Sequence, residues 1–180
     1  MLKMKKIVDM FAKGKHIRLY DVEPMQWISD GAAFYPLEGV PRFNEFTLRK
    51  TYDIDDKVLI LTENALPEAL CFEDASVEEN VVLPDKIQLQ PHGEATTSFR
   101  TQNGVTFVKS RYMDKISANE DTMIYERVSR DGYIYLAAKE GMLVKALILP
   151  MTCPSKDYIS DAEELVQVLR QTYNNENSRE

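Results

Sequence analysis

Residues 105–151 constrain the fold of this 180-residue chain more than any other stretch, because glycine turns separate its apolar runs at short intervals. Val105–Val108 is a β-branched run that follows the Asn103-Gly104 turn, and it predicts a strand. Ser110 can cap a helix after this strand. That helix would carry on one side Tyr112, Met113 and Ile116.

Three further β-rich runs complete the stretch, at 122–128, 133–138 and 143–149. Asp131-Gly132 separates the first two, and such a pair supplies the positive φ values of a two-residue hairpin. Lys139-Glu140-Gly141 separates the second run from the third. The stretch therefore predicts a strand, a short helix and three consecutive strands.

The N-terminal residues predict the same order without the leading strand. Apolar residues at 4, 7, 8 and 11 have the spacing of an amphipathic helix, and Gly14 stands where a left-handed residue would end it. Residues 16–22 alternate as a strand, and Asp30-Gly31 predicts a hairpin between 26–29 and 32–37. We therefore expect two half-domains of one helix and three strands each.

The middle of the chain is less regular. Asn44 is expected to cap a short helix that ends near Tyr52 and buries either Phe46 with Leu48 or Leu48 with Tyr52. After a strand at 58–61, residues 62–84 are acidic and weakly periodic, which favours a boundary or a mobile loop. Further strands are expected at 86–90 and at 96–101, the second paired with 105–108 across the Asn103-Gly104 turn.

The C-terminal residues predict one more helix. Ser160 with Glu163 forms a capping box, and the helix that follows would carry on one face Ala162, Leu165, Val166, Leu169 and Tyr173. We predict one domain over 1–180. Its parts are an N-terminal half (1–61), an acidic connector (62–84), a C-terminal half (85–151), an added helix (152–173) and a disordered tail (174–180).

Composition narrows the class of protein. The chain has a net charge of −7, and its 44% hydrophobic and 28% charged content is typical of a globular protein. No apolar run is long enough to cross a bilayer. Cys71 and Cys153 are too few for a disulfide framework. We expect a cytoplasmic protein without a membrane partner. The average charge conceals a basic N-terminus, because residues 1–18 hold six Lys or Arg residues against Asp9 alone.

The residues that carry chemistry do not converge on a recognised motif. The two histidines and two cysteines lack metal-ligand spacing, and the acidic triplet Asp53, Asp55 and Asp56 is more often a solvated turn than a cation site. We expect no catalytic residue, metal or cofactor. Four clustered aromatic residues are either a base-stacking platform or core, and core is favoured: Trp27, Phe34, Tyr35 and Phe43.

Residues 105–151 resemble the last half-domain of the bacterial DNA polymerase sliding clamp. The matching residues are Phe107, Tyr112, Asp114 and Ile116 in the segment FVKSRYMDKI, and the closing strand ALILPM at 146–151. The resemblance implies an α+β fold with a mainly antiparallel, DNA-clamp-like sheet built from two half-domains, here followed by an added C-terminal helix.

The resemblance also implies two kinds of site. Clamp helices present positive charge to the DNA backbone, and the residues in matching helices here are Lys3, Lys6, Lys13, Lys109, Arg111 and Lys115. Residues at the end of the closing strand help to line a peptide pocket in the clamp, and their counterparts are Leu149, Pro150 and Met151. The clamp ends soon after this point, so the sequence leaves open whether residues 152–173 cover that pocket.

Two hypotheses of function follow. The first is a non-enzymatic clamp-like module that contacts double-stranded DNA or replication and repair proteins, either as a homo-oligomeric ring or as a monomer. The alternative is a small cytosolic protein–protein interaction or regulatory domain without a role on nucleic acid. An enzyme ranks lowest, because the sequence shows no convergent set of polar residues.

Overall fold

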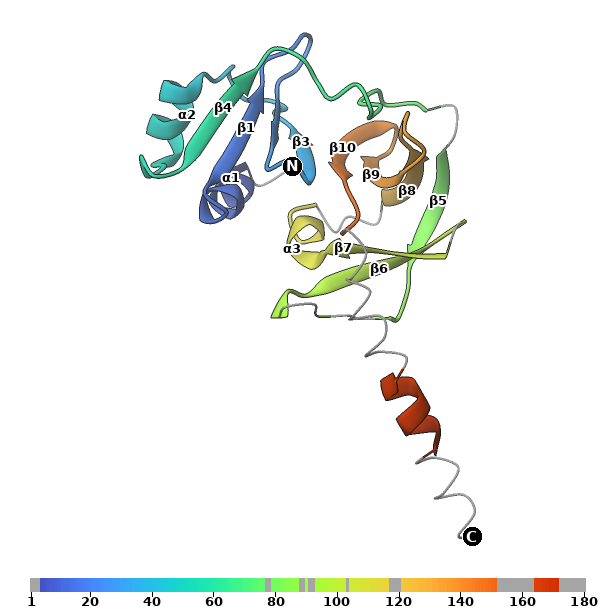
Figure 1. Ribbon diagram of the computed structural model, residues 1–180. Coiled ribbons are helices and arrows are strands. Elements are labelled where there is room, and N and C mark those ends of the chain that lie inside the picture. Colours follow the sequence, from blue (N-terminus) through green and yellow to red (C-terminus); the bar gives the residue numbers. More distant parts are fainter. Residues whose placement is uncertain are drawn as a thin grey trace.

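The computed structural model describes residues 4–76, 79–87, 90, 93–102, 104–116, 121–151 and 164–171. It is an α+β fold with one mixed ten-stranded sheet, in the strand order β4-β1-β2-β3-β10-β9-β8-β5-β6-β7 (Figure 1). The predicted α+β class is confirmed. No helix of the described residues is long and apolar enough to span a lipid bilayer.

The elements follow the predicted order closely. The described helices are α1 (Met4–Lys13), α2 (Glu45–Tyr52), α3 (Ser110–Met113) and a C-terminal helix at 164–171. The strands are β1 (His16–Tyr20), β2 (Trp27–Ser29), β3 (Ala33–Pro36), β4 (Leu59–Glu63), β5 (Glu79–Pro84), β6 (Thr96–Thr101), β7 (Gly104–Lys109), β8 (Thr122–Val128), β9 (Ile134–Glu140) and β10 (Leu143–Ile148).

Two units of one helix and three strands meet edge to edge in the sheet. The first is α1-β1-β2-β3 and the second is α3-β8-β9-β10, and they join where β3 pairs with β10 through Phe34–Leu147 and Ala33–Ile148. Each unit gains one strand on its outer side: β4 pairs with β1, and β5 pairs with β8. The β1–β4 pair is parallel, and this makes the sheet mixed rather than purely antiparallel.

All three labelled helices bury their apolar residues in one core on the first face of the sheet. Ile7, Val8 and Phe11 of α1, Leu48 of α2 and Tyr112 of α3 belong to this core. Tyr35 of β3 connects two of the helices. Its ring packs against Phe11 at a centroid distance of 5.9 Å, and its hydroxyl donates to the Tyr112 carbonyl oxygen at 2.8 Å. Helices α1 and α3 therefore lie on the same face.

The second face of the sheet carries a smaller core and is covered by chain without regular structure. Tyr20, Trp27 and Phe34 belong to this second core. We call residues 64–76 the covering segment. Its Phe72 ring lies edge-on to Trp27 and Phe34, with centroid distances of 5.0 Å and 5.4 Å. The predicted core role of Trp27, Phe34, Tyr35 and Phe43 is confirmed, since all four are buried.

Three predicted turns and caps differ in detail. The positive φ at the end of α1 falls on Lys15 (59°) and not on Gly14. Ser110 does not cap α3, because its hydroxyl hydrogen-bonds to the Thr97 hydroxyl on the neighbouring strand β6. The Asp131-Gly132 turn is a three-residue loop closed by Ser129 and Tyr133, with positive φ at Gly132 (82°) but not at Asp131.

The acidic connector is shorter than predicted, because Glu79–Pro84 form strand β5 beside β8. The strand predicted at 86–90 is wrong for the described residues Lys86, Ile87 and Gln90, which follow β5 without strand structure. The predicted C-terminal helix is present at 164–171. Its capping box and the 174–180 tail lie outside the described residues.

Helix α2 settles the choice that the sequence left open. Asn44 and Thr47 form a capping box at its start, with the Asn44 side chain accepting from the Thr47 amide at 2.9 Å. Leu48 is fully buried and Tyr52 is half-buried in the first core, whereas the Phe46 side chain is 70% exposed. The Leu48–Tyr52 alternative is therefore correct.

The same helix supplies a test of this packing. We expect Leu48→Ala to lower the free energy of unfolding by about 2–5 kcal/mol, because it leaves a cavity in the first core. Phe46→Ala on the same helix should change it by about 0.5 kcal/mol or less. Urea denaturation of both variants measures the difference, and equal losses would show that α2 does not pack as described.

Candidate functional site

A pocket of about 840 Å³ opens on the second face of the sheet. Its walls come from β1, the β2–β3 hairpin, the covering segment, the β8–β9 turn and the residues that follow β10. Most of the lining is apolar. The large side chains in it include Tyr20, Phe34, Leu70, Tyr133, Leu149 and Met151. Its volume lies in the range of pockets that bind small molecules or a few side chains of a peptide.

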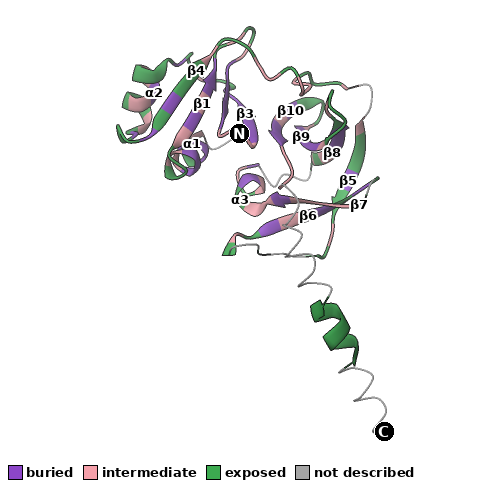
Figure 2. Ribbon diagram, in the orientation of Figure 1, coloured by how far each residue is buried: buried purple, intermediate pink, exposed green. Residues whose placement is uncertain are grey.

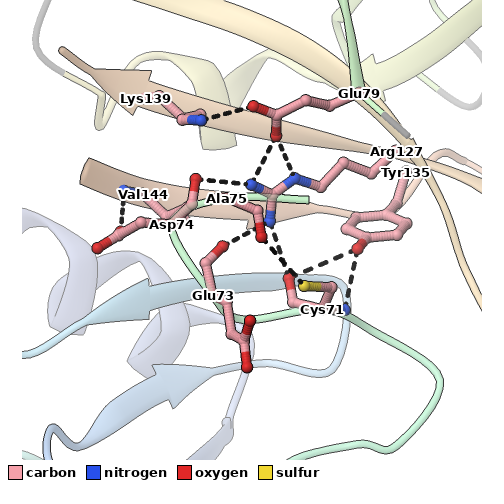
Figure 3. A network of polar contacts seen from close by, with 9 residues as sticks. All are labelled: Cys71, Glu73, Asp74, Ala75, Glu79, Arg127, Tyr135, Lys139 and Val144. Carbon is pink, nitrogen blue, oxygen red and sulfur yellow. Dashed lines mark hydrogen bonds and ion pairs between the residues drawn. The ribbon is translucent and has the colours of Figure 1, made fainter. Parts of the chain in front are cut away.

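One wall of the pocket is the covering segment, and a buried arginine holds that segment on the sheet (Figure 3). Arg127 of β8 is 0% exposed. Its guanidinium donates to the carbonyl oxygens of Cys71, Glu73 and Asp74 at 3.1, 2.9 and 3.1 Å. These backbone groups have no strand to pair with, so the guanidinium satisfies acceptors that a sheet ladder would otherwise satisfy.

Glu79 of β5 balances the charge of Arg127. Its Oε2 accepts from Nε and Nη2 of Arg127 at 2.9 and 2.7 Å, and its Oε1 accepts from Lys139 Nζ at 2.6 Å. Burial favours the neutral acid, but the hydrogen bonds from Lys139 and Arg127 outweigh it and lower the pKa of Glu79. Lys139 also lies over the Tyr125 ring, 4.8 Å from its centroid.

Further hydrogen bonds fix both ends of this wall. The Tyr135 hydroxyl of β9 accepts from the Cys71 amide at 2.9 Å, and the Asp74 carboxylate accepts from the Val144 amide at 2.8 Å. The Arg130 amide donates to the Ala69 carbonyl at 3.0 Å, which joins the covering segment to the β8–β9 turn. The pocket wall is thus tied to β8, β9 and β10.

The β8–β9 turn places Tyr133 at the rim. Ser129 accepts the Tyr133 amide through its side chain at 3.0 Å, and its own amide donates to the Tyr133 carbonyl at 2.8 Å. The Tyr133 side chain is 75% exposed although it lines the pocket. An aromatic ring held at a rim in this way offers contact area to a ligand at low entropic cost.

Arg18 and Tyr20 of β1 supply polar groups to the pocket. Arg18 Nη1 pairs with Glu63 Oε1 at 3.2 Å, and Arg18 Nε is buried without a hydrogen-bond partner among the described residues. Burial raises the pKa of the Tyr20 phenol, and the adjacent Arg18 guanidinium opposes that change. The Tyr20 phenol therefore stays neutral near neutral pH, and the apolar walls of the pocket are combined with two charged residues, Arg18 and Asp131.

All three residues that the resemblance assigned to a peptide pocket line this pocket: Leu149, Pro150 and Met151. The Leu149 amide donates to the Ala32 carbonyl, and the Met151 amide donates to the Phe107 carbonyl, both at 2.8 Å. These bonds fix the chain after β10 against the β2–β3 hairpin and β7. Their peptide-binding role stays a prediction.

The predicted DNA contacts divide into two groups. Lys6 and Lys13 on α1 are exposed, and neither has an ion pair with another described residue, while Lys3 lies outside the described part of the chain. Lys109 and Arg111 near α3 are paired with Glu94 at 2.8 and 3.3 Å.

Arg111 also lies 3.8 Å from Asp30 and over the Tyr112 ring, which leaves it little free charge. Lys115 is half-buried. Among the predicted contacts that the structure describes, Lys6 and Lys13 on α1 are therefore the exposed cations without an ion pair.

The acidic triplet forms a turn. Asp53 ends α2 with φ of 55°, and the Asp55 side chain accepts from the Lys57 amide at 2.8 Å. Among the described residues, no group of three potential ligands could hold a metal ion.

The sequence did not predict the other pocket-lining residues, because they come from five separate segments that only the fold brings together. One signal for the covering segment is present in the sequence: the large apolar residues Leu66, Leu70 and Phe72 stand within an otherwise acidic stretch.

Comparison with known proteins gives no information on function, so the pocket is the main guide to it. No protein-family model, no curated protein and no solved structure matches this chain.

The anchor of the covering segment can be tested with two neighbouring arginines. Arg127→Ala should lower the free energy of unfolding by about 3–5 kcal/mol, because it leaves buried carbonyl groups and part of the Glu79 charge without partners. Arg130→Ala removes a 72% exposed side chain paired with Glu68 and should cost about 0.5 kcal/mol or less. Urea unfolding measures both. A small loss for Arg127→Ala would mean that the covering segment is held by its apolar contacts alone.

Proposed function

We propose that this chain is a non-enzymatic interaction module whose pocket binds a short apolar segment of a partner protein. The observation that carries the proposal is the pocket itself, a hollow of about 840 Å³ with aromatic and aliphatic walls and two charged lining residues, Arg18 and Asp131. Peptide-binding grooves of this kind accept two or three apolar anchors, while polar groups at the rim set their orientation. The resemblance to sliding clamps favours replication or repair proteins as the partner class.

The architecture of the pocket supports this use. Its walls are fixed by backbone hydrogen bonds at Leu149, Met151 and Ala69 and by the buried Arg127, so little ordering is needed when a ligand binds. Tyr133 precedes β9 and Leu149 follows β10, so both lie at the same end of this antiparallel pair, where they can contact one ligand. The pocket faces away from the helices, so a bound segment would not disturb the first core.

Two exposed apolar residues allow a matched test. A displayed library of random peptides selected on the full-length chain should yield sequences with two or three apolar anchors. Tyr133→Ser should weaken their binding by about tenfold, because it removes the large aromatic contact at the rim. Met142→Ser removes an equally exposed side chain outside the pocket, 70% against 75%, and should leave binding unchanged. Failure to select any peptide, or equal effects of the two changes, would reject the proposal.

A second candidate function is contact with the backbone of double-stranded DNA through α1. Lys5, Lys6, Lys13 and Lys15 are exposed on or just after this helix, and none has an ion pair with another described residue. Charge gathered on one helix favours phosphate contact even in an acidic chain. If the clamp resemblance extends to assembly, several copies of this chain would form a ring around the duplex.

The DNA hypothesis predicts a specific change in salt dependence. Fluorescence anisotropy of a labelled duplex should show weak binding whose logarithm falls linearly with the logarithm of salt concentration. Lys6→Glu and Lys13→Glu should each reduce that slope by about one unit, since each removes about one phosphate contact. Lys86→Glu makes the same charge change at an exposed residue after β5, far from α1 in the strand order, and should have no such effect. Equal effects at Lys86 would indicate a response to net charge alone.

A further inference from the structure

The C-terminal helix at 164–171 is exposed at every position, although half of its residues are large and apolar (Figure 2). These residues, 46–59% exposed, are Leu165, Val166, Val168 and Leu169. In proteins an amphipathic helix gains most of its stability by packing its apolar face against another surface. Its apolar side chains therefore require a surface to pack on.

The apolar residues of this helix form one stripe. With 3.6 residues per turn, positions 165, 168 and 169 fall on one side, and 166 extends the same stripe. Glu164, Gln167, Arg170 and Gln171 occupy the remaining side. Such a helix has the form of a groove ligand, which presents anchors at i, i+3 and i+4.

The pocket lies within reach of this helix in the same molecule. Met151 lines the pocket, and residues 152–163 separate it from the start of the helix. Twelve residues of extended chain reach roughly 40 Å, at about 3.3–3.6 Å each. A tether of this length gives an effective concentration in the millimolar range, which favours the helix of the same chain over that of a second molecule.

We infer that the apolar stripe of the C-terminal helix docks in the pocket of its own chain. There it acts as an intramolecular competitor of the partner segment. The docking is inferred from the exposed apolar stripe and the nearby pocket. The competition rests in addition on the proposed peptide-binding function.

Full-length variants test the docking. Leu165→Asp combined with Leu169→Asp disrupts the stripe, and Gln167→Asp combined with Gln171→Asp makes the same charge change on the polar side. In the unmodified chain the amides of residues 168–171 should exchange with solvent about tenfold or more slowly than in the first variant, because docking protects them. The backbone amide signals of Gly132, Tyr133 and Ile134 should move in the first variant only.

Either of two results would overturn the docking: equal exchange rates in the unmodified chain and the first variant, or pocket signals that do not differ between them. Protection that increases with protein concentration would assign the helix to a second copy and would also overturn it. Constant protection across concentrations, with sedimentation as a monomer, supports the docking within one chain.

Binding of a library-selected peptide separates the inference from the proposed function. The Leu165→Asp, Leu169→Asp variant should bind the peptide about tenfold more tightly than the unmodified chain, because it lacks the competitor. Equal binding by the two proteins would overturn the competition and leave the proposed function intact. If no peptide binds either protein, the proposed function fails, and the exchange experiment still decides the docking.

Discussion

The buried guanidinium of Arg127 is the interaction on which the second face of the sheet depends. The covering segment crosses that face without forming a strand or a helix, so its carbonyl groups need partners that a ladder cannot supply. One side chain provides donors for three of them and is itself neutralised by Glu79. A lysine could not do this, because an ammonium group lacks the planar fork that reaches several acceptors at once.

Once the covering segment is fixed, the pocket follows from geometry. Phe72 packs on Trp27 and Phe34, and Leu70 forms the pocket wall beside the β8–β9 turn. The covering segment leaves part of the second core uncovered, and this uncovered part forms the floor of the pocket. The charged cluster in Figure 3 therefore acts as a scaffold for an apolar site, and it lies outside the pocket lining itself.

Local signals in the sequence predicted most of the elements, because hairpins and caps are determined within a few residues. The Asp30-Gly31 hairpin and the Asn44 cap are examples, and both are stabilised by side-chain bonds to amides two or three residues away. Strand β5 and the role of Arg127 escaped prediction, because β5 pairs with the distant strand β8 and the hydrogen-bond partners of Arg127 lie 48–56 residues away. The sliding-clamp resemblance pointed to Leu149, Pro150 and Met151, which line the pocket. The other lining residues come together only through the fold.

The two candidate functions use opposite faces of the sheet. Helix α1 packs on the first core and presents its lysines outward from that face, whereas Arg18, Tyr20 and Leu149 point to the second face with the pocket. Alternation along β1 causes this separation, since Ile17 and Leu19 face the helices and their neighbours face the pocket. A change on one face leaves the residues of the other face in place, so the two proposed functions can be tested independently. A protein that used both would hold an anionic partner on its helices while a second partner competed with the C-terminal helix for the pocket.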